Sequence, residues 1–283
     1  MSNATRRNNF NSPFNPPRVT ASANPMYWAH PTAKIGKDVK IDPFAVIHEN
    51  VEIGDGCWIG SNVSIFPGAR IGKNVQIYPG AVISAVPQDL KFAGEETFTY
   101  IGDNTIIREY VTINRGTAAE GKTVVGSDNL LMAYVHVAHD CQVGSHCILA
   151  NGVTLAGHIT IHDYAIIGGL TAIHQFVHVG AHVMISGGSL VRKDVPPFVK
   201  AAHDPLAYVG VNSVGLRRRG FSNEAIATIQ EIYRILFIRG INTTNAIHAI
   251  ESEIPESAER NQILAFIKQA SRGLMRGYSK DED

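Results

Sequence analysis

The sequence has few cysteines, no net charge and no long hydrophobic segment. Its 283 residues include three cysteines, none in a Cys-x-x-Cys pair, so neither a disulfide framework nor a cysteine-rich zinc site is indicated. Lys plus Arg and Asp plus Glu number 25 each, so no overall field favours nucleic acid. No run of about 18 apolar residues could cross a membrane. These absences predict a soluble, cytoplasmic protein, and the length allows a large core.

Acidic residues are also missing from the N-terminal segment, where none precedes Asp38. Residues 1–29 are instead rich in Asn and Pro, and they lack the apolar core of a secretory signal. We expect this range to be a disordered leader, or to lie upstream of a start at Met26. An organellar transit peptide is the alternative.

A six-residue repeat dominates the remaining sequence. Aliphatic residues occupy every sixth position from Ile35 to Ile83, from Ile101 to Ile113, and from Val125 to Val191. This period fits neither an amphipathic helix nor an alternating strand, but it fits short strands joined by bends in a triangular coil. Three hexads, or 18 residues, make one turn. The sequence therefore predicts a left-handed parallel β-helix of about eight coils over residues 30–200.

The fifth place of each hexad holds a small or β-branched residue, which suits a crowded corner. Cys57, Cys141 and Cys147 all lie at fifth places, so we expect them to be small buried hydrophobes. Two segments, 84–100 and 114–124, interrupt the repeat. Loops on a rigid scaffold commonly carry binding groups.

A helical pattern replaces the repeat after about residue 200. Ser222 is a candidate N-cap, Gly240 a candidate stop, and further helices are expected near 243–252 and 257–272. We expect residues 201–283 to form a C-terminal α-helical domain that covers the open end of the coils.

The 18-residue register turns sequence spacing into spatial proximity for several histidines. His139, Gly157 and Gln175 are 18 residues apart and share one column, while Asp140 and His158 share the next. An imidazole titrates near neutral pH and can act as a general base, and a glycine N–H one coil above can stabilise an oxyanion. Four other histidines are expected to be exposed in bends: His146, His162, His178 and His182.

Two chemistries remain open at this patch. No serine or cysteine nucleophile has comparable support, so direct group transfer is favoured over a covalent acyl-enzyme. The alternative is a zinc site built from His136, His139 and His158, as in the hexapeptide-repeat carbonic anhydrases.

Specific motifs give the chain a resemblance to a known family over Met26 to Arg276. They are Gln88-Asp89-Leu90-Lys91, Phe92-Ala93-Gly94-Glu95, Ile107-Arg108-Glu109, Asn114-Arg115-Gly116-Thr117, Gly126-Ser127-Asp128-Asn129-Leu130-Leu131-Met132, Val137-Ala138-His139-Asp140, His174-Gln175-Phe176 and Gly215-Leu216-Arg217-Arg218-Arg219-Gly220-Phe221. Together they resemble the UDP-N-acetylglucosamine O-acyltransferases of lipid A biosynthesis.

The resemblance implies a reaction and roles for the patch. A (3R)-hydroxyacyl chain would pass from acyl carrier protein to the 3-hydroxyl of UDP-N-acetylglucosamine. His139 would remove the hydroxyl proton, Asp140 would orient the imidazole, and the Gly157 N–H would stabilise the tetrahedral oxyanion. No metal and no cofactor is implied, because the carrier-protein thioester is the co-substrate.

The resemblance also implies the substrate contacts. The matching positions are Asp89, Lys91, His136, His158, His174, Gln175, Asn212, Arg218 and Arg219. Val214 stands where some relatives carry Glu, so one carboxylate contact to the nucleotide sugar is missing. A 3-amino analogue of the sugar stays an open alternative.

Three further expectations follow from the resemblance. Gly169, Met184 and Gly187 would line an acyl groove, and Gly187 would leave it open for a long chain. The family implies a homotrimer with the site between neighbouring chains. Basic residues of the C-terminal part would attract the acidic carrier protein, and a solvated helical face is the alternative; they are Arg217, Arg218, Arg219, Arg234 and Arg239. The competing functions are a coenzyme A-dependent acetyltransferase and a scaffold without enzymatic activity.

Overall fold

The computed structural model describes residues 26–277, so nearly all of the expected leader lies outside the described residues. The coils begin slightly earlier than predicted. Trp28–Ala29 forms the first strand, β1, and the Trp28 N–H donates to Ala45 O at 3.0 Å. Residues 28 and 29 therefore belong to the repeat rather than to the leader.

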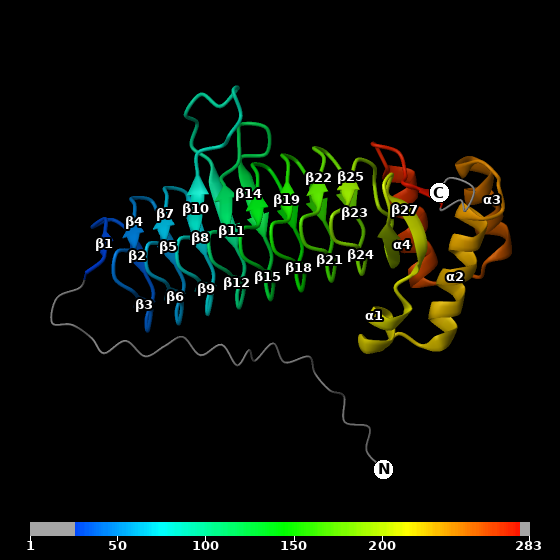
Figure 1. The fold of residues 1–283 in the computed structure, drawn as a ribbon, viewed down its shortest axis with the longest axis horizontal. Helices are drawn as coiled ribbons and strands as arrows, with labels where there is room; N and C mark the ends of the chain where they lie inside the picture. The colour runs from blue at the N-terminus through cyan, green and yellow to red at the C-terminus, as the bar shows by residue number, and fades with distance from the viewer. Residues whose placement is uncertain (1–25, 278–283) are drawn as a thin grey trace, which may run out of the picture.

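The chain winds into a three-sided stack of parallel strands (Figure 1). Sheet 1 consists of β1 (Trp28–Ala29), β4 (Val46–Ile47), β7 (Ser64–Ile65), β10 (Val82–Ala85), β13 (Thr112–Asn114), β16 (His136–Val137), β19 (Thr154–Leu155), β22 (Ala172–Ile173) and β25 (Leu190–Val191). Sheet 2 consists of β2 (Lys34–Ile35), β5 (Glu52–Ile53), β8 (Ala69–Ile71), β11 (Phe98–Ile101), β14 (Lys122–Val125), β17 (Gln142–Val143), β20 (Thr160–Ile161) and β23 (His178–Val179). Sheet 3 consists of β3 (Lys40–Ile41), β6 (Trp58–Ile59), β9 (Gln76–Ile77), β12 (Ile106–Ile107), β15 (Leu130–Leu131), β18 (Ile148–Leu149), β21 (Ile166–Ile167), β24 (Met184–Ile185), β26 (Val199–Ala202), β27 (Ala207–Val211) and β28 (Arg276–Gly277).

The repeat explains why this left-handed β-helix forms. First-place residues such as Ile47 and Leu131 are fully buried in the interior, and the three cysteines are free and buried as predicted. Residues 18 apart pair in register, as His136 does with Thr154 and Thr154 with Ala172. The 18-residue columns of the sequence are therefore real columns in space.

Three corners join the sheets, and each is named here by the sheets it connects. Corner 1–2 contains the bends of His139, Gly157 and Gln175; corner 2–3 contains those of His146, Tyr164 and His182; corner 3–1 contains those of Gly169 and Gly187. Many bends include a non-glycine residue in the left-handed region, such as Asp140 (φ 60°). This conformation, normally costly for a residue with a Cβ, is held by the surrounding coils.

The two predicted loops are present but shorter than expected. β10 extends to Ala85 and β11 begins at Phe98, while β13 ends at Asn114 and β14 begins at Lys122. The strands extend because β11 and β14 pair over four residues, from Phe98 with Lys122 onward. Figure 1 shows both loops rising from the same edge of the stack.

The C-terminal part begins with a strand pair rather than a helix. β26 pairs antiparallel with β27, and four helices follow, with β28 returning to β27. The helices are α1 (Ser213–Arg218), α2 (Asn223–Phe237), α3 (Thr243–Glu253) and α4 (Ala258–Gln269). Ser222 caps α2 as predicted, whereas the short helix α1 was not anticipated.

Helix α2 fixes this part to the end of the coils (Figure 1). Its Tyr233 is fully buried and donates its hydroxyl hydrogen to Pro197 O at 2.5 Å. Within residues 26–277, no helix is both long and apolar enough to span a membrane.

Candidate active site

An imidazole–carboxylate pair lies at corner 1–2, immediately after β16. His139 Nδ1 and Asp140 Oδ2 are 2.8 Å apart, and His139 is only 7% exposed. The adjacent residues face each other because Asp140 adopts the left-handed conformation, which turns its side chain back toward the imidazole. With Nδ1 engaged by the carboxylate, Nε2 is the nitrogen available for a substrate proton.

Thr117 holds the Asp140 carboxylate in place, and Thr123 holds the Asp140 backbone. The Thr117 N–H donates to Oδ1 at 2.9 Å, and its hydroxyl donates to Oδ2 at 2.6 Å. The Asp140 N–H donates to Thr123 Oγ1 at 2.9 Å. Burial alone would raise the pKa of Asp140, but the hydrogen bonds from Thr117 and His139 outweigh it and lower the pKa. The carboxylate is therefore held ionised beside the His139 imidazole.

Gly157 lies directly against the imidazole, as the column predicted. A Cβ at position 157 would come within 2.6 Å of His139 Cε1, so no larger residue fits beside the ring in this position. In the described part of the chain the Gly157 N–H makes no hydrogen bond, whereas its carbonyl accepts from the Phe176 N–H. A free N–H next to the base is suitably placed to bind a developing oxyanion.

Two further histidines flank the pair. His158 lies one coil above Asp140, with Nε2 3.7 Å from Asp140 Oδ2, and its ring stacks on Phe176 at 4.7 Å. His136 Nδ1 is 2.7 Å from Thr112 Oγ1, and burial lowers its pKa. His136 is thus favoured as a neutral ring at the edge of the site.

The first loop reaches the same corner. Asp89 Oδ2 is 4.0 Å from His139 Nε2, and the Lys91 N–H donates to Asp89 Oδ1 at 3.0 Å. Glu95 joins the two loops, because its carboxylate accepts from the Ala93 N–H and the Ala118 N–H. The segment that carries Thr117 is therefore connected to the segment that carries Asp89.

His174 and Gln175 lie two coils above His139 at the same corner. His174 Nδ1 is 3.1 Å from both Gln175 O and Arg272 Nη2. Arg272, from the segment after α4, was not among the expected residues. The contact places a C-terminal cation beside the column of His139.

The remaining predicted substrate contacts lie at a different corner. The Asn212 side chain donates to His182 O at 2.9 Å, and Arg219 Nη2 donates to Tyr164 O at 3.1 Å, which places both at corner 2–3. Arg218 is exposed at the end of α1. The structure therefore does not bring these three residues to His174 and Gln175 within one chain.

Arg219 and the histidines of corner 2–3 form a stacked column. His146 and His182 stack on opposite sides of Tyr164, with ring centroids 4.7 and 4.8 Å from it. The sequence predicted that both rings would be solvent-exposed in bends, and this prediction is wrong. Burial, and then the charge of Arg219, lowers the pKa of His182 to about 4. Among the described residues, buried Nη1 of Arg219 has no hydrogen-bond partner.

The expected acyl-groove residues lie at corner 3–1 and beside it. Gly169 and Gly187 stack one above the other, and a Cβ on Gly187 would meet Gly169 O at 3.0 Å. Met184, on sheet 3, is 42% exposed. The tight spacing gives the two glycines a packing role in addition to any role in binding.

The basic residues expected to attract a carrier protein are partly neutralised. Arg234 pairs with Glu231 at 2.6 Å, and Arg239 pairs with Glu253 at 2.7 Å. Arg219 is half-buried on Tyr164. The helical domain therefore presents less positive charge than the sequence suggested.

A metal fits this patch poorly. The ligand atoms of His139, Asp140 and His158 lie within 4.8 Å of one another, but His136 is not in that group. Both Asp140 oxygens already accept hydrogen bonds from Thr117, and Oδ2 also faces His139 Nδ1. A cation would have to displace these bonds, so the geometry favours an acid–base pair over a zinc site.

The cysteines offer no nucleophile. Burial raises the pKa of the Cys141 and Cys147 thiols to about 12 in each case. A thiol of such high pKa inside the prism is not a thiolate at neutral pH. Fold and site together define a hexapeptide-repeat acyltransferase.

Comparison with known proteins identifies the family. The hexapeptide-repeat profile matches residues 32–67, 50–85 and 122–157, and a profile described as UDP-N-acetylglucosamine O-acyltransferase, domain 2, matches residues 194–275. An acyl-[acyl-carrier-protein]–UDP-N-acetylglucosamine O-acyltransferase of Thiobacillus denitrificans is 49% identical over 90% of this chain and 100% of its own.

Solved structures agree. A UDP-N-acetylglucosamine acyltransferase of Bacteroides fragilis is 52% identical, with a TM-score of 0.89 over 90% of this chain and 100% of its own. That of Arabidopsis is 32% identical, with a TM-score of 0.76 over 90% and 99%. The chain belongs to the UDP-N-acetylglucosamine O-acyltransferase family.

Proposed function

We propose that this protein transfers a (3R)-hydroxyacyl chain from acyl carrier protein to the 3-hydroxyl of UDP-N-acetylglucosamine, a step of lipid A biosynthesis. Family membership supports the substrates. The observation that carries the chemistry is the His139–Asp140 pair at 2.8 Å, with the unbonded Gly157 N–H beside the imidazole.

This arrangement supports the following reaction. His139 Nε2 takes the proton of the sugar 3-hydroxyl as its oxygen attacks the thioester carbonyl, and Asp140 stabilises the imidazolium that forms. The Gly157 N–H donates to the oxyanion of the tetrahedral intermediate. When the intermediate collapses, the carbon–sulfur bond breaks and His139 returns the proton to the departing thiolate. No covalent acyl-enzyme and no cofactor takes part.

The site residues take the following substrate roles in this scheme. Asp89 and Lys91 on the first loop, with His136 and His158 beside the base, would bind the glucosamine. The nucleotide and its phosphates would be held by His174, Gln175, Asn212, Arg218 and Arg219. Arginine suits this because its guanidinium can make two parallel hydrogen bonds to phosphate.

The nucleotide contacts support a homotrimer. His174 and Gln175 lie at corner 1–2, but Asn212 and Arg219 are tied to His182 and Tyr164 at corner 2–3. A nucleotide bound by both groups requires a neighbouring chain whose corner 2–3 faces corner 1–2. A closed trimer would repeat this contact three times. We place the enzyme in the cytoplasm, consistent with three free thiols.

The acyl chain would lie along corner 3–1 of a neighbour. Gly169 and Gly187 add no side chain at their own positions of that corner, and Met184 is exposed beside it. An open groove of this kind suits a long hydroxyacyl chain.

The test is an acyl-transfer assay with the purified protein, hydroxyacyl carrier protein and UDP-N-acetylglucosamine. Wild type should give the 3-O-acyl product, and His139→Ala should lose about 100- to 10,000-fold in kcat. The His146→Ala variant, at corner 2–3, serves as the matched control. Unchanged turnover of His139→Ala would disprove the assigned base. Activity only with an acetyl-coenzyme A donor would favour a coenzyme A-dependent acetyltransferase, and activity only with stoichiometric zinc would favour a zinc enzyme.

A further inference from the structure

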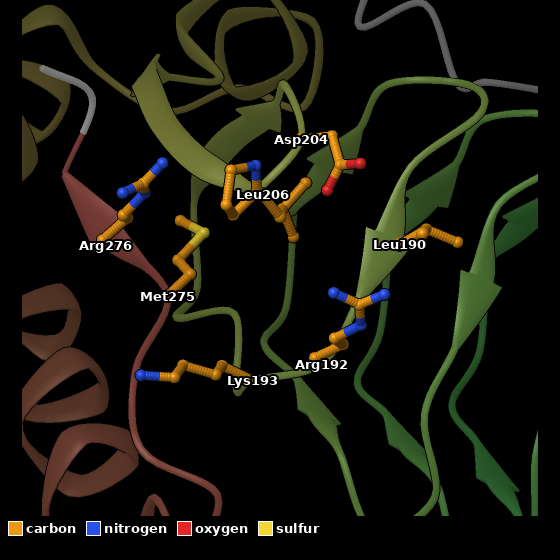
Figure 2. A pocket seen from close by; sticks show the side chains of 8 residues that line it. Leu190, Arg192, Lys193, Asp204, Leu206, Met275 and Arg276 are labelled. Carbon is orange, nitrogen blue, oxygen red and sulfur yellow. The ribbon is translucent and has the colours of Figure 1, made fainter. Parts of the chain in front are cut away.

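A pocket lies where the last coil meets the C-terminal domain, outside the groups assigned above. Its volume is about 230 Å³. Leu190, Leu206 and Met275 provide apolar lining, and cationic side chains project from the chain around it. Figure 2 shows Arg192 and Arg276 on opposite sides of the cavity, with Met275 between them. The pocket therefore combines an apolar floor with a basic rim.

The rim carries excess positive charge. Arg192, Lys193 and Arg276 line the pocket together with a single acidic residue, Asp204. Arg192 and Lys193 are exposed, and neither makes an ion pair with any residue in the range 26–277. By contrast, Arg234 of the helical domain is paired with Glu231. Arg192 and Lys193 therefore give the pocket rim positive charge, unpaired within the described residues, that can attract an acidic partner.

The pocket lies on the same side of the prism as the base. Leu190 pairs with Ala172, Ala172 with Thr154, and Thr154 with His136, so Leu190 is three coils above His136. At about 4.8 Å per coil, the separation is roughly 14 Å. Arg192 and Lys193 follow β25 as Ala138 and His139 follow β16.

This separation matches the reach of a carrier-protein arm. The phosphopantetheine arm has about as many backbone bonds as four extended residues, or roughly 15 Å from thiol to phosphate. Its phosphate end is anionic, and its pantoyl segment carries two methyl groups. A thioester held at His139 would therefore bring the phosphate to the basic rim and the pantoyl segment to the apolar floor.

We propose that the pocket lined by Leu190, Leu206 and Met275, with its rim of Arg192 and Lys193, is the docking site for the phosphate end of the arm and for the acidic carrier protein behind it. This inference rests on the proposed function, because it takes carrier protein as the donor. Complementary charge at such a rim acts mainly on encounter and on donor affinity rather than on the chemical step.

The experiment compares two charge reversals at opposite ends of the prism. Arg192→Glu/Lys193→Glu changes the rim, and Lys37→Glu/Lys40→Glu makes the same change in charge on the first coils, where both lysines are exposed. Each variant is assayed with acyl carrier protein and with acyl-pantetheine, which lacks both the phosphate and the protein. Thermal melting of each variant checks that it is folded.

We expect the rim variant to raise KM for acyl carrier protein by roughly tenfold or more, with kcat within about twofold. Its KM for acyl-pantetheine should stay at the wild-type value, and the control variant should leave both unchanged. An unchanged KM of the rim variant for acyl carrier protein would overturn the proposal. An altered preference for acyl-chain length would also overturn it, because the pocket would then bind the acyl tail. Failure of the proposed function is distinct, since wild type would then transfer no acyl chain from either donor.

Discussion

Corners 1–2 and 2–3 have the same backbone but carry different side chains. Asp140 and His158 at corner 1–2 have φ of 60°, and Tyr164 and His182 at corner 2–3 have φ of 62° and 60°. At corner 2–3, rings at this position stack on rings one coil away. At corner 1–2 the ring of His158 follows a carboxylate, which faces His139 instead. A carboxylate in place of a ring in this column, at Asp140, thus gives the His139 imidazole its hydrogen-bonding partner.

The two corners also differ in the charge state of their buried side chains. Burial and Arg219 lower the pKa of His182 to about 4, so this stacked ring stays neutral at ordinary pH. Hydrogen bonds from Thr117 and His139 lower the pKa of Asp140 despite its burial, so this carboxylate stays charged. A stack needs neutral surfaces, whereas a base needs a charged partner.

The largest effect should come from exchanging the aspartate at corner 1–2. Asp140→Asn removes the charge that stabilises an imidazolium and offers His139 the wrong hydrogen-bonding group, so we expect kcat to fall about 100- to 1,000-fold. Asp128→Asn makes the same change at the left-handed position of corner 2–3, where Asp128 accepts from Asn104. Steady-state kinetics should show less than about a twofold change there. Equal losses in the two variants would remove the distinction between the corners.

Corner 3–1 has a different proposed role, which is to set the length of the acyl chain. Gly187→Met should block the groove and remove room for several methylenes, each worth about 0.8 kcal/mol of burial or roughly fourfold in kcat/KM. The optimum should shift to a shorter hydroxyacyl chain. Competition among acyl carrier proteins of different chain length measures this, and melting checks the fold, because the new Cβ would lie 3.0 Å from Gly169 O. An unchanged optimum would leave Gly187 with a packing role alone.

A smaller effect is expected from the hydroxyl that holds Asp140. Thr117→Val removes the 2.6 Å bond but keeps the backbone bond to Oδ1, so the pKa of Asp140 should rise. Asp140 would then be protonated up to a higher pH, and the acid limb of kcat/KM should move upward, with about a tenfold loss on that limb. Stability should follow the same direction. The lowered pKa of the Asp140 carboxyl adds to the free energy of unfolding at high pH, and this stabilisation is lost as the pH falls through that pKa. Thr117→Ser should restore the wild-type pH profile; a parallel loss at every pH in Thr117→Val would indicate a purely structural role.

The smallest effect should come from the stack itself. His146→Ala removes one ring contact to Tyr164, worth about 0.5–1.5 kcal/mol, and touches none of the proposed substrate contacts. Chemical denaturation should show that loss while kcat stays at the wild-type value. A fall in kcat would mean that corner 2–3 contributes to the chemical step and not only to stability and nucleotide binding.

Much of the fold was predictable because each coil repeats one local rule. The aliphatic hexads gave the interior, and the 18-residue spacing placed Gly157 beside His139. The rule fails where loops are inserted. Thr117 is 23 residues from Asp140, a separation that is no multiple of the six-residue repeat. Thr117 does belong to the family motif Asn114-Arg115-Gly116-Thr117.

Contacts with the C-terminal part were equally hidden. Arg219 lies 55 residues from Tyr164 and Arg272 lies 98 from His174, so only the folded chain shows these pairs. The ion pairs of Arg234 and Arg239 with glutamates were also missed, because a count of basic residues does not reveal their partners. Local periodicity predicted the scaffold, and tertiary contacts determined how charge is distributed on it.

Subunit mixing tests the proposal that corner 1–2 of one chain works with corner 2–3 of another. His139→Ala and Arg218→Ala chains, each weakly active alone, are unfolded together, refolded and assayed at limiting nucleotide sugar. If the site lies between chains, random assembly leaves about a quarter of the sites with both residues intact, so activity should recover to about a quarter of wild type. A mixture no more active than the average of the two variants would contradict the account.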